Sequence, residues 1–329
     1  MADIPADFFE TFDEASRKLA DVRREVGQFV FGQEAITTHA LTALLSGGHM
    51  LLIGVPGLAK TRLVSTLARV IGLECKRIQC TPDLMPSDII GSEVLEEVDY
   101  GRRNFRFVHG PVFCQFLMVD EINRASPRTQ SALLQAMQEQ TVTVNGRDYT
   151  LPAPFHVLAT QNPLEQEGTF PLPEAQLDRF LIQITVEQPS LDTERRIVLA
   201  TAEPSDATPK PVLFAEDMLK MQRIVRKIPL APDLVERILT FVRAGRPETT
   251  PLESVRRCVF WGPGPRASQA LALTMRAHAL LQGRHQVTID DLRAMAGPVL
   301  KHRLALHYRA KTDGIDADAI IKDMLTTIA

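Results

Sequence analysis

The pattern of hydrophobic and polar positions in roughly the first 190 residues predicts five short strands that alternate with longer amphipathic segments. The strands are expected at residues 49–53, 76–79, 116–119, 156–160 and 180–186. Several are apolar at consecutive positions, as in LLI and FLMV, which is typical of strands that are buried on both faces of a parallel sheet. Between the strands, apolar residues recur at helical spacing, for example after Lys60 and within residues 127–140. This alternation predicts an α/β fold with a parallel, doubly wound sheet.

Two segments interrupt the alternation. The segment TVTVNGRDYT at residues 141–150 alternates around Asn145 and Gly146, which predicts a hairpin with a type I′ turn. Residues 93–109 predict a second hairpin, with DYGRRN at its tip. Neither hairpin is needed to build the sheet, so we expect both to be insertions that project from it.

The strand pattern stops beyond residue 190. Residues 202–211 are rich in Pro, Ser and Thr and predict a linker. Helical spacing follows, and Gly283 is expected to end a helix that starts near Arg266. Thr288 precedes two aspartates, a pattern typical of a helix N-cap. We therefore predict an α/β core at residues 1–205 and a C-terminal all-α domain at residues 206–329.

Composition narrows the class of protein. A length of 329 residues suits about two domains. The net charge of −3 counts against a dedicated duplex-DNA binder. The four cysteines lack any C-x-x-C spacing, which favours a reducing compartment over a disulfide framework or a zinc site. The N-terminal segment lacks the regions of a signal peptide, and no apolar run reaches about 18 residues. We expect a cytoplasmic protein without membrane insertion.

The first chemical signal is the segment GVPGLAKT, which begins at Gly54. It follows a predicted strand and opens a predicted helix, which is the context of a phosphate-binding loop. Gly54 and Gly57 permit close approach of backbone N–H groups to a polyphosphate. Lys60 can bring its charge to the β- and γ-phosphates, and the Thr61 hydroxyl can reach Mg²⁺. Ala59 stands where the pattern G-x-x-x-x-G-K-[ST] has a glycine.

Polar residues also follow two later strands. The run FLMV ends in Asp120 and Glu121, and acids at the C-terminal end of a buried strand face the ligand crevice of an α/β sheet. Asp120 can hold Mg²⁺, and Glu121 can polarise a water for attack on the γ-phosphate. Asn162 can hold the same water from the other side, with Thr160 as the alternative. Arg124, just after the acids, is expected at the surface.

The order of five motifs resembles the AAA+ ATPases. The motifs are GVPGLAKT, FLMVDEINRA, ATQNP, FPLPEAQLDRF and GPGPRASQAL. More narrowly, the chain is similar to the MoxR family, whose members share the AKT variant of the loop and the LPEAQLDRF segment. The resemblance begins at Val30 and covers nearly the whole chain. It implies a P-loop AAA+ core with helix-2 insert and pre-sensor 1 hairpins, followed by an all-α lid.

The resemblance also implies roles for individual residues. Asn162 matches sensor 1, and Arg179 matches the arginine finger that reaches a neighbouring subunit's γ-phosphate. Arg266 matches sensor 2, and in the subgroup with both insertions it can act on the neighbour's nucleotide instead of its own. With Glu121, these are the implied catalytic residues. The implied ATP-binding residues are Phe31, Gly32, Gln33, Gly54, Val55, Pro56, Gly57, Leu58, Ala59, Lys60, Thr61 and Asp120, of which Thr61 and Asp120 also bind Mg²⁺.

The function that follows is ATP hydrolysis by a ring, commonly a hexamer, that remodels or activates partner protein complexes in the manner of a chaperone. The resemblance implies a partner with a von Willebrand factor A domain and a protein client that the residues do not identify. Three alternatives stay open. The first is a kinase or GTPase, although the sequence has no guanine-reading N-K-x-D run. The second is a DNA-directed helicase or loader, which would use Arg102, Arg103 and Arg147 on the hairpins. The third is an ATP-gated scaffold, which would not need Glu121.

Overall fold

The centre of the fold is a five-stranded parallel sheet. The computed structural model describes residues 8–98, 102–165, 167–202 and 207–328. The strands stand in the order β2-β5-β8-β1-β9, and every pairing is parallel. Their bounds are β1 Met50–Ile53, β2 Cys75–Gln79, β5 Phe116–Asp120, β8 His156–Gln161 and β9 Ile182–Thr185. All five predicted strands are confirmed, although their ends differ by a residue or more.

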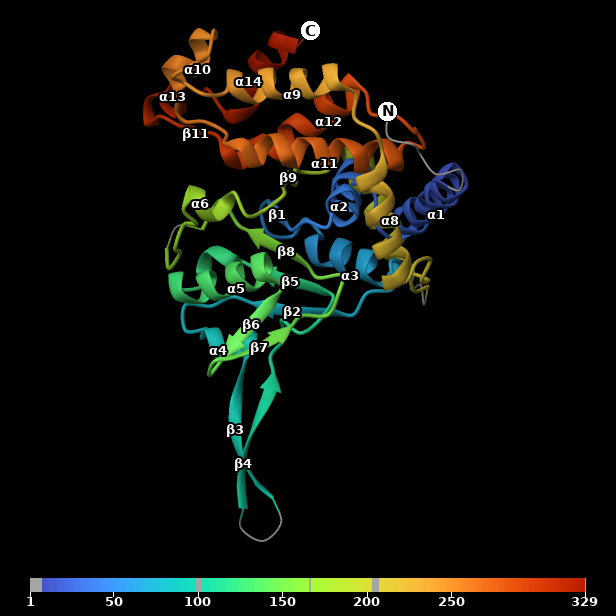
Figure 1. The fold of residues 1–329 in the computed structure, drawn as a ribbon, viewed down its shortest axis with the longest axis vertical. Coiled ribbons are helices and arrows are strands. Elements are labelled where there is room, and N and C mark those ends of the chain that lie inside the picture. The colour runs from blue at the N-terminus through green and yellow to red at the C-terminus, as the bar shows by residue number, and fades with distance from the viewer. Residues whose placement is uncertain (1–7, 99–101, 166, 203–206, 329) are drawn as a thin grey trace.

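Helices cover both faces of this sheet (Figure 1), which explains why its central strands β1, β5 and β8 are buried at consecutive positions. Successive residues of a strand point to opposite faces, so Met50 and Leu52 of β1 enter one buried cluster and Leu51 enters another. The first cluster includes residues of α1 (Phe8–Phe29), α2 (Glu34–Leu45) and α3 (Lys60–Val70). The second includes residues of α4 (Pro86–Ile90) and α5 (Pro127–Glu139).

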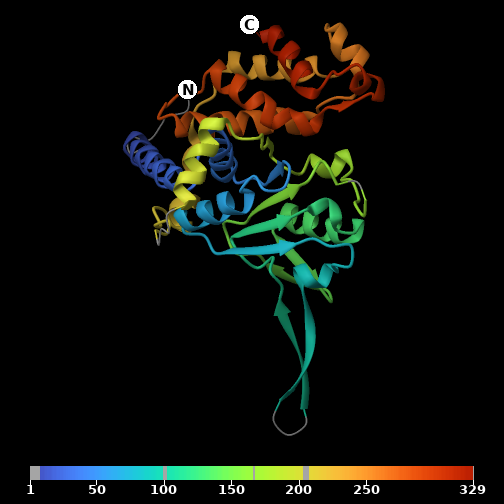
Figure 2. The ribbon, with the colours of Figure 1, turned by 180° about the vertical axis from the view of Figure 1, so that it is seen from behind.

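Both predicted hairpins are present. Strands β3 (Gly91–Val98) and β4 (Arg102–His109) form a long hairpin that extends away from the body of the molecule (Figures 1 and 2), and its tip at residues 99–101 lies outside the described residues. Strands β6 (Thr141–Val144) and β7 (Arg147–Thr150) form the short one. Its turn residues Asn145 and Gly146 have φ angles of +49° and +78°, as a type I′ turn requires.

The C-terminal part of the chain is a helical lid. Short elements α6 (Glu174–Leu177) and α7 (Leu191–Ala202) lead into it. Its helices are α8 Ala215–Lys227, α9 Pro232–Ala244, α10 Glu253–Cys258, α11 Pro265–Leu281, α12 Ile289–Leu300, α13 Tyr308–Thr312 and α14 Ala317–Leu325, with short turns η2 Lys301–Arg303 and η3 Thr326–Ile328. The lid departs from the expected all-α pattern in one short antiparallel strand pair, β10 (Val259–Trp261) with β11 (Ala305–Leu306).

The predicted ends of the lid helices are confirmed. Gly283 follows α11 with a φ angle of +67°, and Thr288 caps α12 by a reciprocal pair of hydrogen bonds with Asp291. The Asp291 side chain is fully buried between His278 and Arg284. Burial raises the pKa of Asp291, but hydrogen bonds from these two neighbours outweigh it and lower the pKa to about 2. This network ties the end of α11 to the start of α12.

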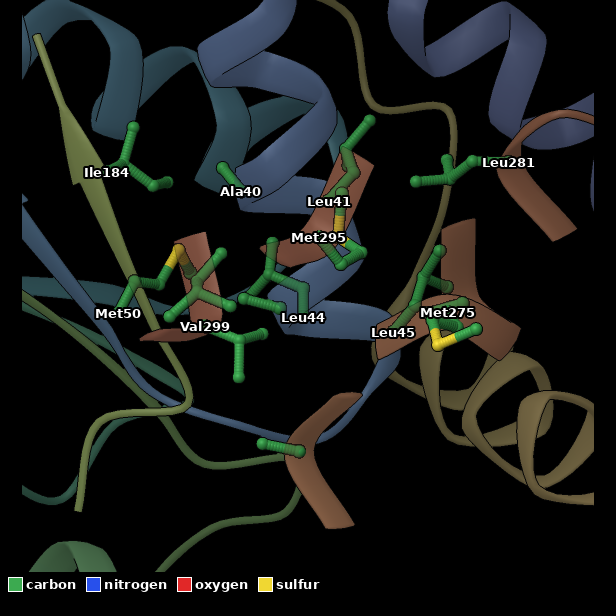
Figure 3. Close-up of a cluster of buried hydrophobic side chains, with 14 of the residues drawn as sticks. Ala40, Leu41, Leu44, Leu45, Met50, Ile184, Met275, Leu281, Met295 and Val299 are labelled. Carbon is green, nitrogen blue, oxygen red and sulfur yellow. The ribbon is translucent and has the colours of Figure 1, made fainter. Parts of the chain in front are cut away.

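Lid and sheet share one hydrophobic core. Leu41, Leu44 and Leu45 of α2 gather with Met50 of β1 and with the lid residues Met275 and Met295 (Figure 3), and all six side chains belong to the first cluster. The division at residue 205 falls among residues 203–206, outside the described ranges, and stays a prediction. None of the helices in the described ranges combines the length and the apolar composition of a membrane span.

Candidate active site

The phosphate-binding loop connects the end of β1 to the start of α3. At Gly57 the φ angle is +86°, and an added Cβ would meet no atom within 4 Å, so a ligand can approach this backbone closely. Ala59 is the N-cap of α3 and is left-handed, with φ +53° and ψ +24°. A residue with a Cβ pays about 1–2 kcal/mol for this conformation. The missing glycine therefore leaves the loop geometry intact but adds local strain.

Lys60 lies half-buried under this loop. Its Nζ donates to the carbonyl oxygen of Gly54 at 2.6 Å. Burial lowers the pKa of Lys60, and the nearby carboxylates of Asp120 and Glu121 act in the opposite direction. A partly desolvated ammonium group at a helix N-terminus is suited to an anionic ligand such as phosphate.

Asp120 ends β5 and is held on both sides. Its Oδ1 accepts a hydrogen bond from the Thr160 hydroxyl at 3.1 Å, and its Oδ2 accepts one from Arg77 Nε at 2.6 Å. The Asp120 side chain is only 9% exposed. Thr160 also accepts a hydrogen bond from the backbone N–H of Glu121 at 3.0 Å. Thr160 thus contacts both acids and also lines the cavity that Asn162 lines.

Glu121 directly follows β5 and has a left-handed backbone conformation with φ +55°. Its Oε2 accepts hydrogen bonds from Gln79 Nε2 at 2.9 Å and from Arg124 Nη1 at 3.1 Å. Arg124 is half-buried and pairs with the acid that would activate water. The sequence alone did not point to Arg77 or Gln79, because nothing in it places β2 beside β5, where Gln79 lies opposite Asp120.

Asn162 follows β8 and is 4% exposed. Its Oδ1 accepts a hydrogen bond from the backbone N–H of Leu164 at 3.1 Å, which leaves the amide nitrogen to donate toward the adjoining cavity. This cavity has a volume of about 340 Å³. Its lining brings together the predicted residues Pro56, Gly57, Leu58, Ala59, Lys60, Thr61, Asp120, Glu121, Thr160 and Asn162 with Arg77 and Gln79. Val55 and Gly54 belong to the same loop but do not line the cavity.

The donor set suits a magnesium nucleotide. Thr61 and Asp120 offer the hard oxygen atoms that Mg²⁺ prefers, and Lys60 and the loop backbone offer donors to phosphate. A second cavity of about 580 Å³ lies beside Gly32 and Gln33 and reaches α12 of the lid. Gln33 donates from Nε2 to the carbonyl oxygen of Leu58 at 3.1 Å, while its buried Oε1 accepts nothing from any described residue. That orphaned acceptor fits the amino group of a base.

Gly32 and Phe31 are held by α7. Gly32 has a φ of +68°, and a Cβ there would overlap the Thr193 side chain, so only glycine fits. The Phe31 ring lies 5.4 Å from the Arg196 guanidinium carbon. Phe31 does not line the cavity beside Gly32 and Gln33.

The structure places Arg179 and Arg266 elsewhere. They line a third cavity, of about 350 Å³, together with Asp178 and Arg303. This cavity adjoins the N-terminal end of β1, because Leu181 N donates to His49 O at 2.8 Å. The phosphate-binding loop follows the opposite end of that four-residue strand, about 13 Å away at about 3.3 Å per residue. Neither arginine is therefore brought to the phosphate-binding loop of its own chain.

A parallel sheet in this order, with a phosphate-binding loop after β1, acids after β5 and a helical lid, defines an AAA ATPase. The chain matches the family model described as "ATPase family associated with various cellular activities (AAA)" over residues 49–182, and that of the AAA lid domain over residues 253–324. It is 44% identical over 307 residues to the chaperone MoxR1 of Mycobacterium tuberculosis, covering 93% of this chain and 80% of that protein.

Two further matches agree. The chain is 31% identical over 306 residues to the protein MoxR of Paracoccus denitrificans, with 88% of this chain and 89% of that protein covered. The crystal structure of a candidate ATPase from Cytophaga hutchinsonii superimposes with a TM-score of 0.90 at 38% identity, and the match covers 97% of both chains. The chain belongs to the MoxR family of AAA ATPases.

Proposed function

We propose that this chain hydrolyses ATP to ADP and phosphate with Mg²⁺, within a homo-oligomeric ring that remodels or activates other protein complexes. The observation that carries the proposal is the meeting of Lys60, Asp120, Glu121 and Asn162 around one cavity. These residues end or follow β1, β5 and β8, which are neighbours in the sheet.

Binding and charge neutralisation fall to the phosphate-binding loop and to β5. The backbone N–H groups of the loop and the ammonium group of Lys60 hold the phosphates. Thr61 and Asp120 would hold Mg²⁺, which supplies neutralisation of the charge on the β- and γ-phosphates. Because Arg77 occupies Oδ2 of Asp120, that ion pair must loosen for the carboxylate to serve as a ligand.

Proton removal falls to Glu121. Its carboxylate accepts a proton from the attacking water, as a general base positioned within hydrogen-bond reach would. To do so, it must exchange hydrogen bonds with Gln79 and Arg124 for one with that water. Asn162 donates from its amide nitrogen and orients the water from the far side.

Charge that develops on the γ-phosphate calls for a cation from outside the chain. Arg179 and Arg266 line one cavity near the N-terminal end of β1, away from the phosphate-binding loop. This location supports a role for both in the active site of a neighbouring copy. An arginine finger contributes about 10³–10⁵ in rate. We propose a hexamer, because the family commonly forms one.

The partners are inferred from the family alone. The relative from Mycobacterium tuberculosis is named a chaperone, which supports a remodelling role here. We propose a partner with a von Willebrand factor A domain and a protein client of unidentified sequence. All four cysteines are free thiols, which is in keeping with a cytoplasmic location.

The test is the dependence of ATPase activity on assembly. Activity per subunit should rise with protein concentration, and Arg179→Ala should lower kcat by about 10³-fold or more while ATP binding is retained. Arg195→Ala is the matched control, because Arg195 is exposed and pairs with Asp192 on α7. Unchanged, concentration-dependent turnover in Arg179→Ala would disprove the trans arginine finger.

An ATP-gated scaffold is the second candidate. It is favoured by one observation, the engagement of Glu121 by both Gln79 and Arg124. If assembled rings bind ATP without releasing phosphate, and if Gln79→Ala does not restore turnover, the scaffold is the better description.

A further inference from the structure

One buried arginine of the lid is hydrogen-bonded to residues 178–181, the segment that carries Arg179. Arg303 lies in η2 and is 3% exposed. Its Nε donates to Asp178 Oδ1 at 2.7 Å, its Nη2 to Phe180 O at 2.7 Å, and its Nη1 to Leu181 O at 3.0 Å. The three acceptors belong to the residues on either side of Arg179.

A guanidinium group is suited to this task because it offers five N–H donors in a rigid planar fork. Here the fork spans a side-chain carboxylate and two main-chain carbonyl groups, and Nη1 also donates to Val299 O in α12. The neighbouring His302 adds a second contact, with its Nε2 at 3.0 Å from Phe180 O. Asp178, Phe180 and Leu181 are thereby attached to the lid.

The ion pairs of Asp178 also hold this segment in place. One carboxylate oxygen of Asp178 bonds to Arg303, and the other lies 3.7 Å from Nη1 of Arg266. Arg179, between these anchored neighbours, is half-exposed and has no ion-pair partner among the described residues. The carboxylate is therefore used to hold the segment, and the Arg179 side chain stays available to an incoming phosphate.

Stability alone does not explain a buried ion pair. Replacing such a pair by apolar residues of similar volume is often neutral or stabilising. A buried, hydrogen-bonded charge does impose one geometry on the groups around it. A misplacement of about 1 Å at a reacting centre can reduce the rate about 10²-fold. Geometry is therefore the property that Arg303 contributes.

We propose that Arg303 is the positioning residue of the trans-acting Arg179, fixing residues 178–181 to the lid so that Arg179 reaches the γ-phosphate of the neighbouring copy. The inference rests on the proposed function, in which Arg179 acts in trans. It adds that the lid of one subunit sets the hydrolysis rate in the next subunit, while nucleotide binding in its own subunit is left unchanged.

Mixed rings test this directly. The donor subunit carries Glu121→Gln, so its own site is inactive while its Arg179 is intact. The acceptor subunit carries Arg179→Ala, so its site has Glu121 but it offers no finger. Neither should hydrolyse ATP alone, and mixing them should restore activity. If mixing restores nothing, the trans finger fails, and the role of Arg303 fails with it.

Arg303→Lys is then added to one subunit type at a time. Placed in the donor, it should lower the restored activity at least about tenfold, since lysine cannot reproduce the fork. Placed in the acceptor, it should leave the restored activity unchanged, because the acceptor offers no finger. Full activity with the Arg303→Lys donor, or equal losses in both placements, would overturn the proposal while the trans finger stands.

Two further variants guard against misfolding. Asp178→Asn keeps the shape and one acceptor oxygen but removes the charge, so in the donor it should cause a smaller loss than Arg303→Lys. Arg309→Lys is the matched control, because Arg309 is an exposed arginine on α13 of the same lid. Ring assembly and ATP affinity of each variant are measured alongside. A donor loss that Arg309→Lys matches would also overturn the proposal.

Discussion

Arg77→Met should strengthen Mg²⁺ binding, because in the proposed function the Arg77 guanidinium and the metal ion would compete for the same carboxylate. Arg77 Nε lies 2.6 Å from Asp120 Oδ2, and Asp120 is the acid expected to hold the metal. Methionine keeps most of the aliphatic length of the arginine side chain but has no charge and no N–H donor. The substitution therefore removes the competitor with little change in packing.

The expected size follows from exposure. The Arg77 side chain is 54% exposed and that of Asp120 is 9% exposed. Exposed ion pairs contribute about 0.2–1 kcal/mol, and a short charge-assisted hydrogen bond to a nearly buried carboxylate belongs at the upper end, at about 1 kcal/mol. Releasing that amount corresponds to about a fivefold lower apparent Kd for Mg²⁺.

The assay is a Mg²⁺ titration of nucleotide binding in the Glu121→Gln background, followed by calorimetry. Arg106→Met is the matched control, because Arg106 pairs with Glu96 on the hairpin with both side chains about half-exposed. An unchanged or weaker Mg²⁺ affinity in Arg77→Met, with the control unaffected, would refute the competition. It would indicate instead that Arg77 helps to hold the phosphates.

Three predictions concern stability. Asp291→Asn should lower the free energy of unfolding at pH 7 by about 2 kcal/mol, because the hydrogen-bonded network holds the pKa of Asp291 at about 2. This stabilisation is lost as the pH falls from about 4 through 2. Urea unfolding at several pH values checks the prediction, with exposed Asp290→Asn as the control. Ala59→Gly should raise stability by up to about 1 kcal/mol, because relief of left-handed strain exceeds the added entropy of the unfolded chain; a lower melting temperature would contradict this. Burial lowers the pKa of His49 to about 4, so the unfolded chain binds the proton more readily, and His49 should remove about 3 kcal/mol of stability as the pH falls from about 6.5 to 4. His49→Gln should flatten that part of the pH profile, and an equally steep profile would count against the assignment.

Local patterns were sufficient for the elements of the core. The central strands were recognisable because burial on both faces makes consecutive residues apolar, as at Phe116–Asp120. The turn at Asn145 was recognisable because positive φ angles at two successive residues restrict the amino acids that fit. The phosphate-binding loop and the paired acids are contiguous segments whose chemistry follows from their own residues.

Pairings across the chain were not accessible in this way. The neighbours of Asp120 and Glu121 include Arg77 and Gln79, which come close only because β2 pairs with β5. Strand order depends on which faces the helices cover, and no short segment encodes it. The opposing signs of charge at this site, and hence the ion pair between Arg77 and Asp120, therefore emerged only from the sheet.

By itself the sequence determined the class of fold and the positions of the predicted phosphate-binding loop, the two acids and Asn162 at the ends of strands, because each depends on residues that are close along the chain. Only the tertiary structure decided that Arg179 and Arg266 lie together near the N-terminal end of β1, whereas Lys60 lies beyond its C-terminal end. Only the tertiary structure joined Arg303 to Asp178, 125 residues away. Such contacts form when the lid packs on α2 and the sheet, and the buried area that drives this packing is a property of the whole chain.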